Sequence, residues 1–300
     1  MAGAFTVVNL SQLPAPNVVE SLDFETILAA MIADLQERDP TFTAMVESDP
    51  AYKILEVCAY RELLMRQRVN ESAKAIMLAY ATGADLDQLG ANVGVQRQVI
   101  TPADETTVPP TPAVMESDED FRARIQLSPE GYTTAGSEGS YVFHGLGADA
   151  DVKDIQAISP EPGKVTVYVL SRTGDGTAPQ STLNAVTATL NGETIRPMTD
   201  EVTVLSANIV NYTVTAELTL LPGPDATVVL QSAIDAVTAF VESQRRIGYD
   251  VTLSGLYHAL HQPGVQNVNL TSPATSLVLG DGQASYCTAI NVTLADDTDV

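Results

Sequence analysis

Histidine is the most versatile chemical side chain near neutral pH, and this sequence has three histidines. His258 and His261 lie three residues apart on an expected helix, a spacing at which two imidazoles can share one metal ion. No HExxH pattern and no closely spaced cysteine pair accompanies them, so the sequence does not predict a metal site. His144 and His258 occupy matching places in two similar segments, which favours a repeated packing role over catalysis.

Two acidic clusters, at 47–50 and 116–120, resemble metal or acid–base sites. Each lies immediately before an expected helix, where Ser and Asp cap the first turn and carboxylates meet the positive end of the helix dipole. We therefore interpret both clusters as helix caps. The glycines form neither a phosphate-binding loop nor a dinucleotide fingerprint, and no GxSxG nucleophile motif occurs. The sequence predicts no catalytic, cofactor or metal site, and we expect no enzymatic activity.

Composition places the chain among folded proteins, because 45% of its residues are hydrophobic and 18% are charged. Its 300 residues suffice for two or three domains. No uninterrupted apolar run approaches the length of a membrane span, and the N-terminus lacks a basic segment before an apolar run. We expect a chain made in a cytoplasm, without membrane insertion. The two cysteines, Cys58 and Cys287, lack disulfide or metal spacing and are expected to be reduced, buried thiols.

Charge is unevenly distributed along the chain. The net charge of −23 argues against nucleic acid as a partner, since phosphate binding needs a basic surface. Basic residues nevertheless gather in one helical segment, and none follows Arg246. They could dock an acidic neighbour or the acidic end of another copy, although an ordinary solvated helix face has the same composition. The candidate interaction surface consists of Lys53, Arg61, Arg66, Arg68 and Lys74.

These residues must be positioned by helices in the first hundred residues. Apolar residues from Phe24 to Leu35 recur at helical period, with Ser21 as the expected N-cap and Asp39-Pro40 as the end. Asp49-Pro50 predicts a second helix start. Its stripe is interrupted by polar side chains, so it may face both a core and a partner. The stripe comprises Ile54, Val57, Cys58, Arg61, Leu64, Arg68, Val69, Ser72, Ile76 and Ala79.

The remaining two thirds of the chain predict a linker and then mixed structure. Residues 98–116 are rich in Pro and Thr and lack periodicity, which indicates an extended linker, and a brief helix is expected at 116–126. Alternating and periodic segments then predict strands and helices. The strands are expected at 152–159, 164–171, 202–207, 212–221, 265–271, 276–279 and 287–294, and the helices at 181–190, 226–244 and 253–261.

Two segments of this region resemble each other. Ser140 to His144 leads to a strand that ends in Ser159-Pro160, and Ser254 to His258 leads to a strand that ends in Ser272-Pro273. Both consist of a short helix, a turn and a strand, which suggests two related modules in tandem. We therefore predict an α+β fold, with a helical N-terminal region followed by two small helix-on-sheet modules. The expected domains are 1–97 (helical), 98–135 (linker and short helix), 136–207 (first module) and 208–300 (second module).

Ordered sequence blocks carry a resemblance to a known family. They are Glu47–Pro50, Lys53–Glu56, Ala59–Glu62, Arg66–Asn70, Leu78–Ala81, Gly83–Ala91, Glu116–Glu119, Phe121-Arg122, Arg124-Ile125, Ser159-Pro160, Pro162-Gly163, Arg196–Asp200 and Cys287-Thr288. In this combination the chain resembles the baseplate J-like proteins of contractile-tailed phages and phage-tail-like particles, from Leu13 to about Val292. The Pro/Thr segment at 101–112 departs from the family pattern.

The resemblance implies a baseplate wedge component without an active site. Such a protein links neighbouring wedges into a ring around the central hub, and the ring rearranges when the tail contracts. The implied partners are other wedge and hub proteins and further copies of the chain. The implied location is the tail baseplate of the virion, after assembly in the bacterial host cytoplasm.

Two other functions fit the sequence less well. A receptor-binding tip is usually fibrous or β-rich with many aromatic residues, whereas the first third here is helical and only 5% of residues are aromatic. A tail-associated hydrolase needs a convergent carboxylate pair, and the 38 acidic residues give no preferred pair.

Overall fold

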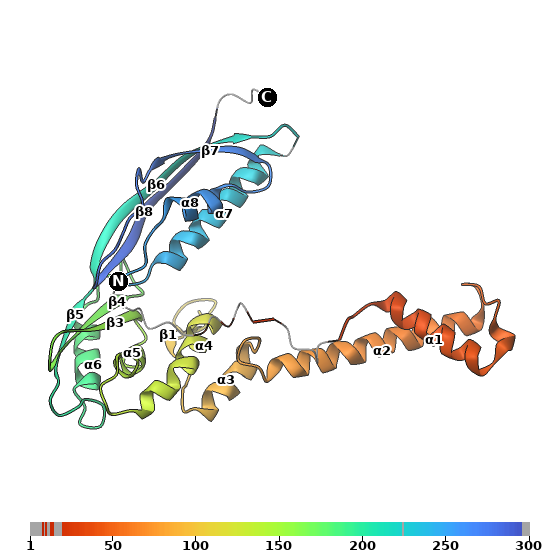
Figure 1. The fold of residues 1–300 in the computed structure, drawn as a ribbon, viewed down its shortest axis with the longest axis horizontal. Helices are drawn as coiled ribbons and strands as arrows, with labels where there is room; N and C mark the ends of the chain where they lie inside the picture. The colour runs from red at the N-terminus through yellow and green to blue at the C-terminus, as the bar shows by residue number, and fades with distance from the viewer. Residues whose placement is uncertain (1–7, 9, 11–12, 15–19, 224, 296–300) are drawn as a thin grey trace. The chain divides into compact units, whose positions relative to one another are not determined.

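The computed structural model describes residues 8, 10, 13–14, 20–223 and 225–295. They form two compact units (Figure 1). The helical unit comprises the described residues up to Arg97 together with Ser117–Ile125. The sheet unit comprises Gln98–Glu116 and the described residues from Gln126 onward. The order of elements confirms the predicted α+β class, with helices first and helix-and-sheet modules after them.

The helical unit begins with two helices that pack along each other. Helix α1 (Phe24–Arg38) is followed by the 3-10 turn η2 (Pro40–Phe42) and by α2 (Pro50–Ala75). Asp23 caps α1 by accepting the Glu25 N–H at 3.1 Å, so the predicted N-cap, Ser21, is wrong. The shorter Asp23 lies directly before the first helical residue, where its carboxylate reaches an unpaired N–H. The predicted starts and ends at Asp39-Pro40 and Asp49-Pro50 are confirmed.

A second cluster of the helical unit joins α3 (Gly83–Asn92) to the part of α4 (Asp118–Leu127) that lies before Gln126. Gly90 allows this approach, because a Cβ there would lie 2.5 Å from the Phe121 ring. Arg122 donates to the carbonyls of Leu78 and Ala81, each at 2.7 Å. These bonds fix the chain directly after α2 to α4.

The Pro/Thr-rich segment is more ordered than the sequence predicts. Strands β1 (Val99–Thr101) and β2 (Val114–Met115) pair antiparallel, and Asp104 and Thr111 exchange both backbone hydrogen bonds at 2.9 Å. The Asp104 carboxylate accepts the Thr106 N–H at 2.8 Å. The segment expected to be extended is therefore a short hairpin, and Asp104 supplies the turn chemistry that the periodicity analysis missed.

The first module of the sheet unit contains the 3-10 turn η3 (Ser128–Tyr132), α5 (Glu138–Leu146), β3 (Val152–Glu161), β4 (Lys164–Ser171), α6 (Gln180–Leu190) and β5 (Glu201–Ser206). Its sheet has the order β3-β4-β5, with β3 antiparallel and β5 parallel to the central strand. The positive φ of Gly163 allows the tight β3–β4 turn. The predicted strands and helix of this module are confirmed to within about two residues.

The second module contains β6 (Asn208–Leu220), α7 (Ala226–Gln244), α8 (Leu253–Leu260), β7 (Val265–Ser272) and β8 (Gln283–Leu294). Every second residue of β6 from Tyr212 to Leu220 is buried, the pattern of a strand with one face on a core. Both helices cover that face (Figure 1). The predicted strand at 276–279 is wrong, because only one isolated bridge, Leu277 with Val251, forms there.

The two modules reach the same sheet arrangement by different chain orders. In each, a central strand pairs antiparallel with the strand that follows a short helix, and parallel with the last strand of the module. The short helix and its strand come first in the first module (α5–β3) and late in the second (α8–β7). The sequence similarity between 140–160 and 254–273 falls on these two helix–strand pairs.

Strand β3 connects the modules to each other. Lys153 forms an ion pair with Glu242 of α7, the Asp154 carboxylate accepts the Ile247 N–H at 2.8 Å, and Gln156 accepts the Gly282 N–H at 2.7 Å. A small apolar cluster of Leu170, Ala207, Ile247 and Ala284 lies beside these contacts. The sheet unit is thus held together by both polar and apolar contacts.

Among the described residues, one helix, α7, is long and apolar enough to cross a membrane by length and composition. These criteria alone are weak evidence, since core helices also satisfy them. Val229, Ala233 and Val237 of α7 are buried in the core of the second module, so here the apolar composition serves the packing of helix on sheet.

Candidate assembly surface

One face of α2 is covered by the chain itself. Ala59 is fully buried, and Tyr52, Leu55 and Leu63 pack around it against Ile27 and Leu28 of α1. These positions recur at three and four residues, so they form one stripe along the helix. The small side chain of Ala59 lets the two helix backbones approach closely.

The other apolar face of α2 is open. The most exposed of its side chains are Ile76 at 73%, Met65 at 70%, Ile54 at 64% and Val57 at 61%. Val69 and Leu64 extend the same stripe and are also exposed. At 100° per residue this open face lies roughly 140° around the helix from the covered face. The stripe predicted from the sequence is this open one, and the stripe that meets the core was missed.

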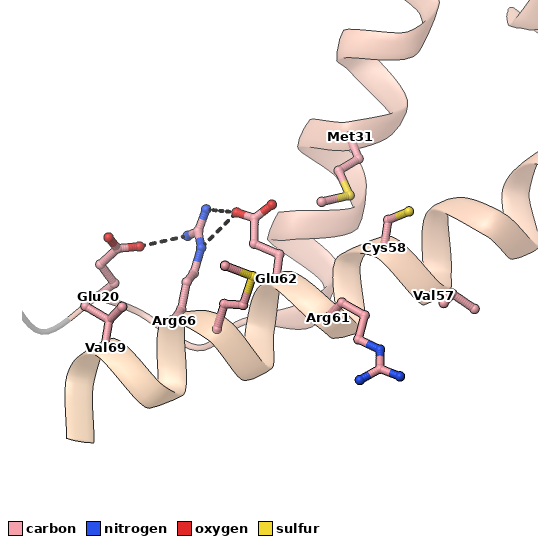
Figure 2. A pocket seen from close by; sticks show the side chains of 9 residues that line it. Glu20, Met31, Val57, Cys58, Arg61, Glu62, Arg66 and Val69 are labelled. Carbon is pink, nitrogen blue, oxygen red and sulfur yellow. Dashed lines mark hydrogen bonds and ion pairs between the residues drawn. The ribbon is translucent and has the colours of Figure 1, made fainter. Parts of the chain in front are cut away.

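A shallow hollow lies where the open face meets α1. It has a volume of about 640 Å³. Figure 2 shows its lining side chains, with Met31 from α1 opposite Cys58 from α2. The full lining consists of Glu20, Met31, Val57, Cys58, Arg61, Glu62, Met65, Arg66 and Val69. A concave, mainly apolar surface with charged residues at its margin is typical of the place where a partner inserts a side chain.

The five basic residues expected to form a surface have different surroundings. Lys53 lies 2.9 Å from Glu56 on the next turn. Arg66 pairs with Glu62 and, at 3.4 Å, with Glu20, as the dashed lines in Figure 2 show. The ammonium group of Lys74 lies 6.0 Å from the centre of the Tyr80 ring. These three cations therefore have partners within their own unit.

Arg61 and Arg68 differ from the other three basic residues. Both are exposed, and neither has a hydrogen bond or ion pair with any residue that the structure describes. They are seven residues apart, about 10.5 Å along the helix axis, and they lie within the open apolar stripe. In Figure 2 the Arg61 side chain points away from the Glu20–Arg66–Glu62 group. The stripe thus combines apolar side chains with two guanidinium groups that are available to an acceptor.

Asn70 was not identified from the sequence, although it positions this surface. Its side chain is buried, accepts the Glu20 N–H at 2.9 Å and donates to the Glu20 carbonyl at 2.8 Å. The segment before α1 is thereby fixed to α2, next to the hollow. A signal did exist, because Asn70 continues the Ala59–Leu63 stripe at helical spacing.

The cysteines correct one expectation. Cys58 is exposed on α2, so the prediction that it is buried is wrong. It lies on the face that α1 leaves open, which the sequence could not distinguish from the covered face. Cys287 is half-buried in β8, and burial raises the pKa of its thiol.

The residues first considered for chemistry have structural partners. Ser117 caps α4 by accepting the Asp120 N–H at 3.1 Å, as predicted. Glu116 does not cap: its carboxylate is buried and accepts the Gln98 N–H at 3.1 Å. Asp49 stands at the N-cap of α2, but its carboxylate accepts the N–H of the preceding Val46 at 3.1 Å.

The histidines form no metal cluster within the part of the chain that the structure describes. No group of three or more His, Cys, Asp or Glu side chains there could hold a metal ion. Burial lowers the pKa of His144, against an opposing hydrogen bond with the Gly131 backbone. His144 also makes an edge contact with Phe143, at 5.2 Å between ring centres. These surroundings are those of a packed imidazole.

Comparisons with known proteins cover nearly the whole chain. Three family models match in order: the baseplate J-like N-terminal domain at 47–104, the baseplate J-like central domain at 133–206 and the baseplate J-like protein C-terminal domain at 212–293. The chain is 50% identical over 293 residues to baseplate protein J of Escherichia phage P2, which covers 95% of this chain and 97% of that protein.

A solved structure gives a more distant similarity. A chain in the cryo-EM structure of the anti-feeding prophage baseplate, six-fold symmetrised, matches 61% of this chain with a TM-score of 0.41 and 15% identity. The match spans 44% of that longer chain.

Proposed function

The chain belongs to the baseplate J-like protein family, and from this premise we propose that it is a structural subunit of a contractile phage-tail baseplate. Its place is the tail baseplate of the virion, after assembly in the host cytoplasm. Its role is to hold other proteins in position and not to catalyse a reaction. The 50% identity to a baseplate protein over nearly the full length of both chains supports this proposal.

The finer part of the proposal concerns assembly. The chain acts as a wedge component that contacts other wedge and hub proteins and further copies of itself, so that the wedges form a ring around the hub. The domains expected from the sequence (1–97, 98–135, 136–207 and 208–300) are the parts that we propose to make separate contacts. A ring subunit needs several distinct surfaces on one chain.

The observation that carries the assembly role is the open stripe of α2. Complete burial of one large apolar side chain is worth roughly 1.5–3 kcal/mol, so a partner that covers several of them gains substantial free energy. Desolvated arginines beside apolar anchors are characteristic of interface hot spots. Arg61 and Arg68 can each receive a carboxylate in a two-pronged hydrogen bond. The stripe therefore fits an acidic, apolar partner surface.

The mixed character of the stripe also suits a ring that rearranges. Switching requires an interface with two arrangements of similar free energy. A seam with guanidinium groups can exchange acceptors, whereas a wholly apolar seam has to expose its side chains before it moves. We propose that the α2 contact changes partner atoms when the tail contracts.

A co-expression experiment tests this function. The chain is produced with the products of its flanking genes, and molar mass is measured by light scattering. We expect a stable hetero-complex that is lost in the Val57→Asp/Val69→Asp variant and weakened in the Arg61→Glu/Arg68→Glu variant. The matched control is Val228→Asp, because Val228 is an exposed valine of α7 outside the stripe. A chain that remains monomeric with every neighbour, or a complex that the stripe variants leave intact, would contradict the proposal.

A further inference from the structure

The edges of the two sheets differ in how they are protected. An edge strand offers unpaired N–H and C=O groups, and charges, prolines or short length usually prevent it from pairing with another chain. Edge strand β3 of the first sheet carries Lys153, Asp154, Pro160 and Glu161. The opposite edge strand, β5, has only six residues and begins with Glu201. Both edges of the first sheet thus have protective features.

The second sheet has one protected and one unprotected edge. Its edge strand β7 has eight residues, with Pro263 just before it and Pro273 just after it. The other edge strand, β8, has twelve residues, QASYCTAINVTL, with no charged residue and no proline. It is therefore the longest edge strand of the two sheets and the one without these features.

The outer side of β8 is open over most of its length. On its inner side β8 pairs with β6 from Gln283 to Leu294. On its outer side Ala284 bridges to Ile247, and Gly248 donates to the Gln283 carbonyl at 2.8 Å. From Tyr286 to Leu294 the backbone pairs with no other described segment. This leaves about 30 Å of strand edge, at roughly 3.3 Å per residue.

The side chains of this edge do not obstruct pairing. Ile290, Val292 and Leu294 face the helices that cover the sheet. Ala289, Asn291 and Thr293 alternate with them and are exposed on the other face. They are small and uncharged, so a neighbouring strand meets neither bulk nor charge.

We propose that β8 pairs antiparallel with β8 of a second copy of this chain, across a two-fold axis. The two three-stranded sheets then become one six-stranded sheet. The unpaired backbone groups specify an extended strand as the occupant, because a strand supplies donors and acceptors at the matching spacing. Charge identifies the strand as a second copy: chains with a net charge of −23 repel each other, and self-pairing needs a segment without like charges. β8 is such a segment.

This interface is separate from the open stripe of α2 and requires no other protein. The test is the molar mass of the full chain by light scattering over a range of concentrations, with hydrogen exchange on the same samples. We expect a monomer–dimer equilibrium in which the amides of 286–294 exchange more slowly in the dimer. The Asn291→Lys/Thr293→Lys variant should raise the dimer dissociation constant by at least about tenfold, since like charges then meet on one face of the joined sheet.

Two controls make the result specific. The lysine variant changes the net charge from −23 to −21, which reduces general repulsion, so weaker pairing cannot come from net charge. The variant Thr203→Lys/Leu205→Lys adds the same charges to exposed positions of β5 and should dimerise like the parent chain. The α2 variant Val57→Asp/Val69→Asp should also dimerise normally, which separates this interface from the proposed function.

Three results would overturn the proposal. The chain could stay monomeric up to its solubility limit, the β8 lysines could leave the dimer intact, or the exchange protection could fall outside 286–294. A dimer that only the α2 variant abolishes would likewise refute pairing through β8, while it would support the α2 surface.

Discussion

Helices α2 and α7 are the two longest described helices, and they use their apolar residues in opposite ways. In α7, Val229, Ala233 and Val237 recur every four residues and are buried against the sheet of their own module. In α2, Ile54, Val57 and others recur at similar spacing but lie in the open, while a second stripe packs on α1. One helix completes the core of its own unit, and the other retains an uncovered face.

The difference shows that an apolar stripe alone does not identify a core. Both helices satisfy the periodicity criterion, and α7 even has the length and composition of a membrane span. What separates them is whether the chain supplies a covering surface. Two helices with similar patterns therefore predict different consequences of mutation: loss of folding in α7 and loss of assembly in α2.

The largest expected effect comes from placing a charge in each stripe. Val237→Asp buries an unpaired carboxylate in the core of the second module and should destabilise it by on the order of 4 kcal/mol. Val69→Asp, at a position that is 52% exposed, should change stability by less than about 0.5 kcal/mol. Urea unfolding measures both. Equal losses of stability would break the comparison, because α2 would then have a covered stripe on both sides.

A smaller effect is expected at the polar contact on the covered side of α2. Asn70→Ala removes two hydrogen bonds to the Glu20 backbone and should cost about 1 kcal/mol. Gln67→Ala on the exposed side of the same helix is the control, since its partner Glu71 is also exposed. Faster hydrogen exchange in the segment around Glu20, seen only in the Asn70 variant, would sharpen the assignment. Identical exchange in both variants would show that Asn70 does not hold this segment.

The smallest effect concerns Asp154, beside the contact between β3 and the end of α7. Burial raises the pKa of Asp154 above its ordinary 3.8, although the Ile247 N–H and the charge of Arg246 oppose the shift. Folding therefore takes up a proton at pH values between 3.8 and the raised pKa. The stabilisation associated with this proton is fully present below pH 3.8 and is lost as pH rises through the folded pKa.

Asp154→Asn keeps a hydrogen-bond acceptor but removes this titration. Relative to the variant, the parent chain should lose stability as pH rises from 4 toward 7, by less than about 1 kcal/mol. Urea unfolding of both proteins across that range measures the difference. A difference of the opposite sign would mean that the carboxylate is stabilised in its charged form.

The sequence predicts most elements of this fold because their signals are local. Asp49-Pro50 marks the start of α2, and alternation marks β3 and β4, where the structure places them. Expectations failed where a distant neighbour decides. Periodicity showed a stripe on α2 but not that α1 would cover Ala59 on the other side, and this also misplaced Cys58 as buried.

Other misses have different physical causes. The short β1–β2 hairpin has no apolar alternation, because its ordering comes from hydrogen bonds to the Asp104 side chain and backbone. The apolar residues around Leu277 suggested a strand, although only a single bridge forms there. Of the five candidate interaction residues, the sequence could not show that three have partners within the helical unit, while Arg61 and Arg68 lie in the open stripe.

The central claim is that another protein covers the open face of α2 in the baseplate, and Cys58 lies on that face. The decisive measurement is the rate at which a maleimide reagent labels Cys58 in the free chain and in assembled tails. Half-buried Cys287 serves as the internal reference, and a Cys58→Ser variant confirms the assignment. We predict rapid labelling of Cys58 in the free chain and at least about tenfold slower labelling after assembly, as expected for a thiol within a closed interface. Equal labelling rates in both states would contradict the claim.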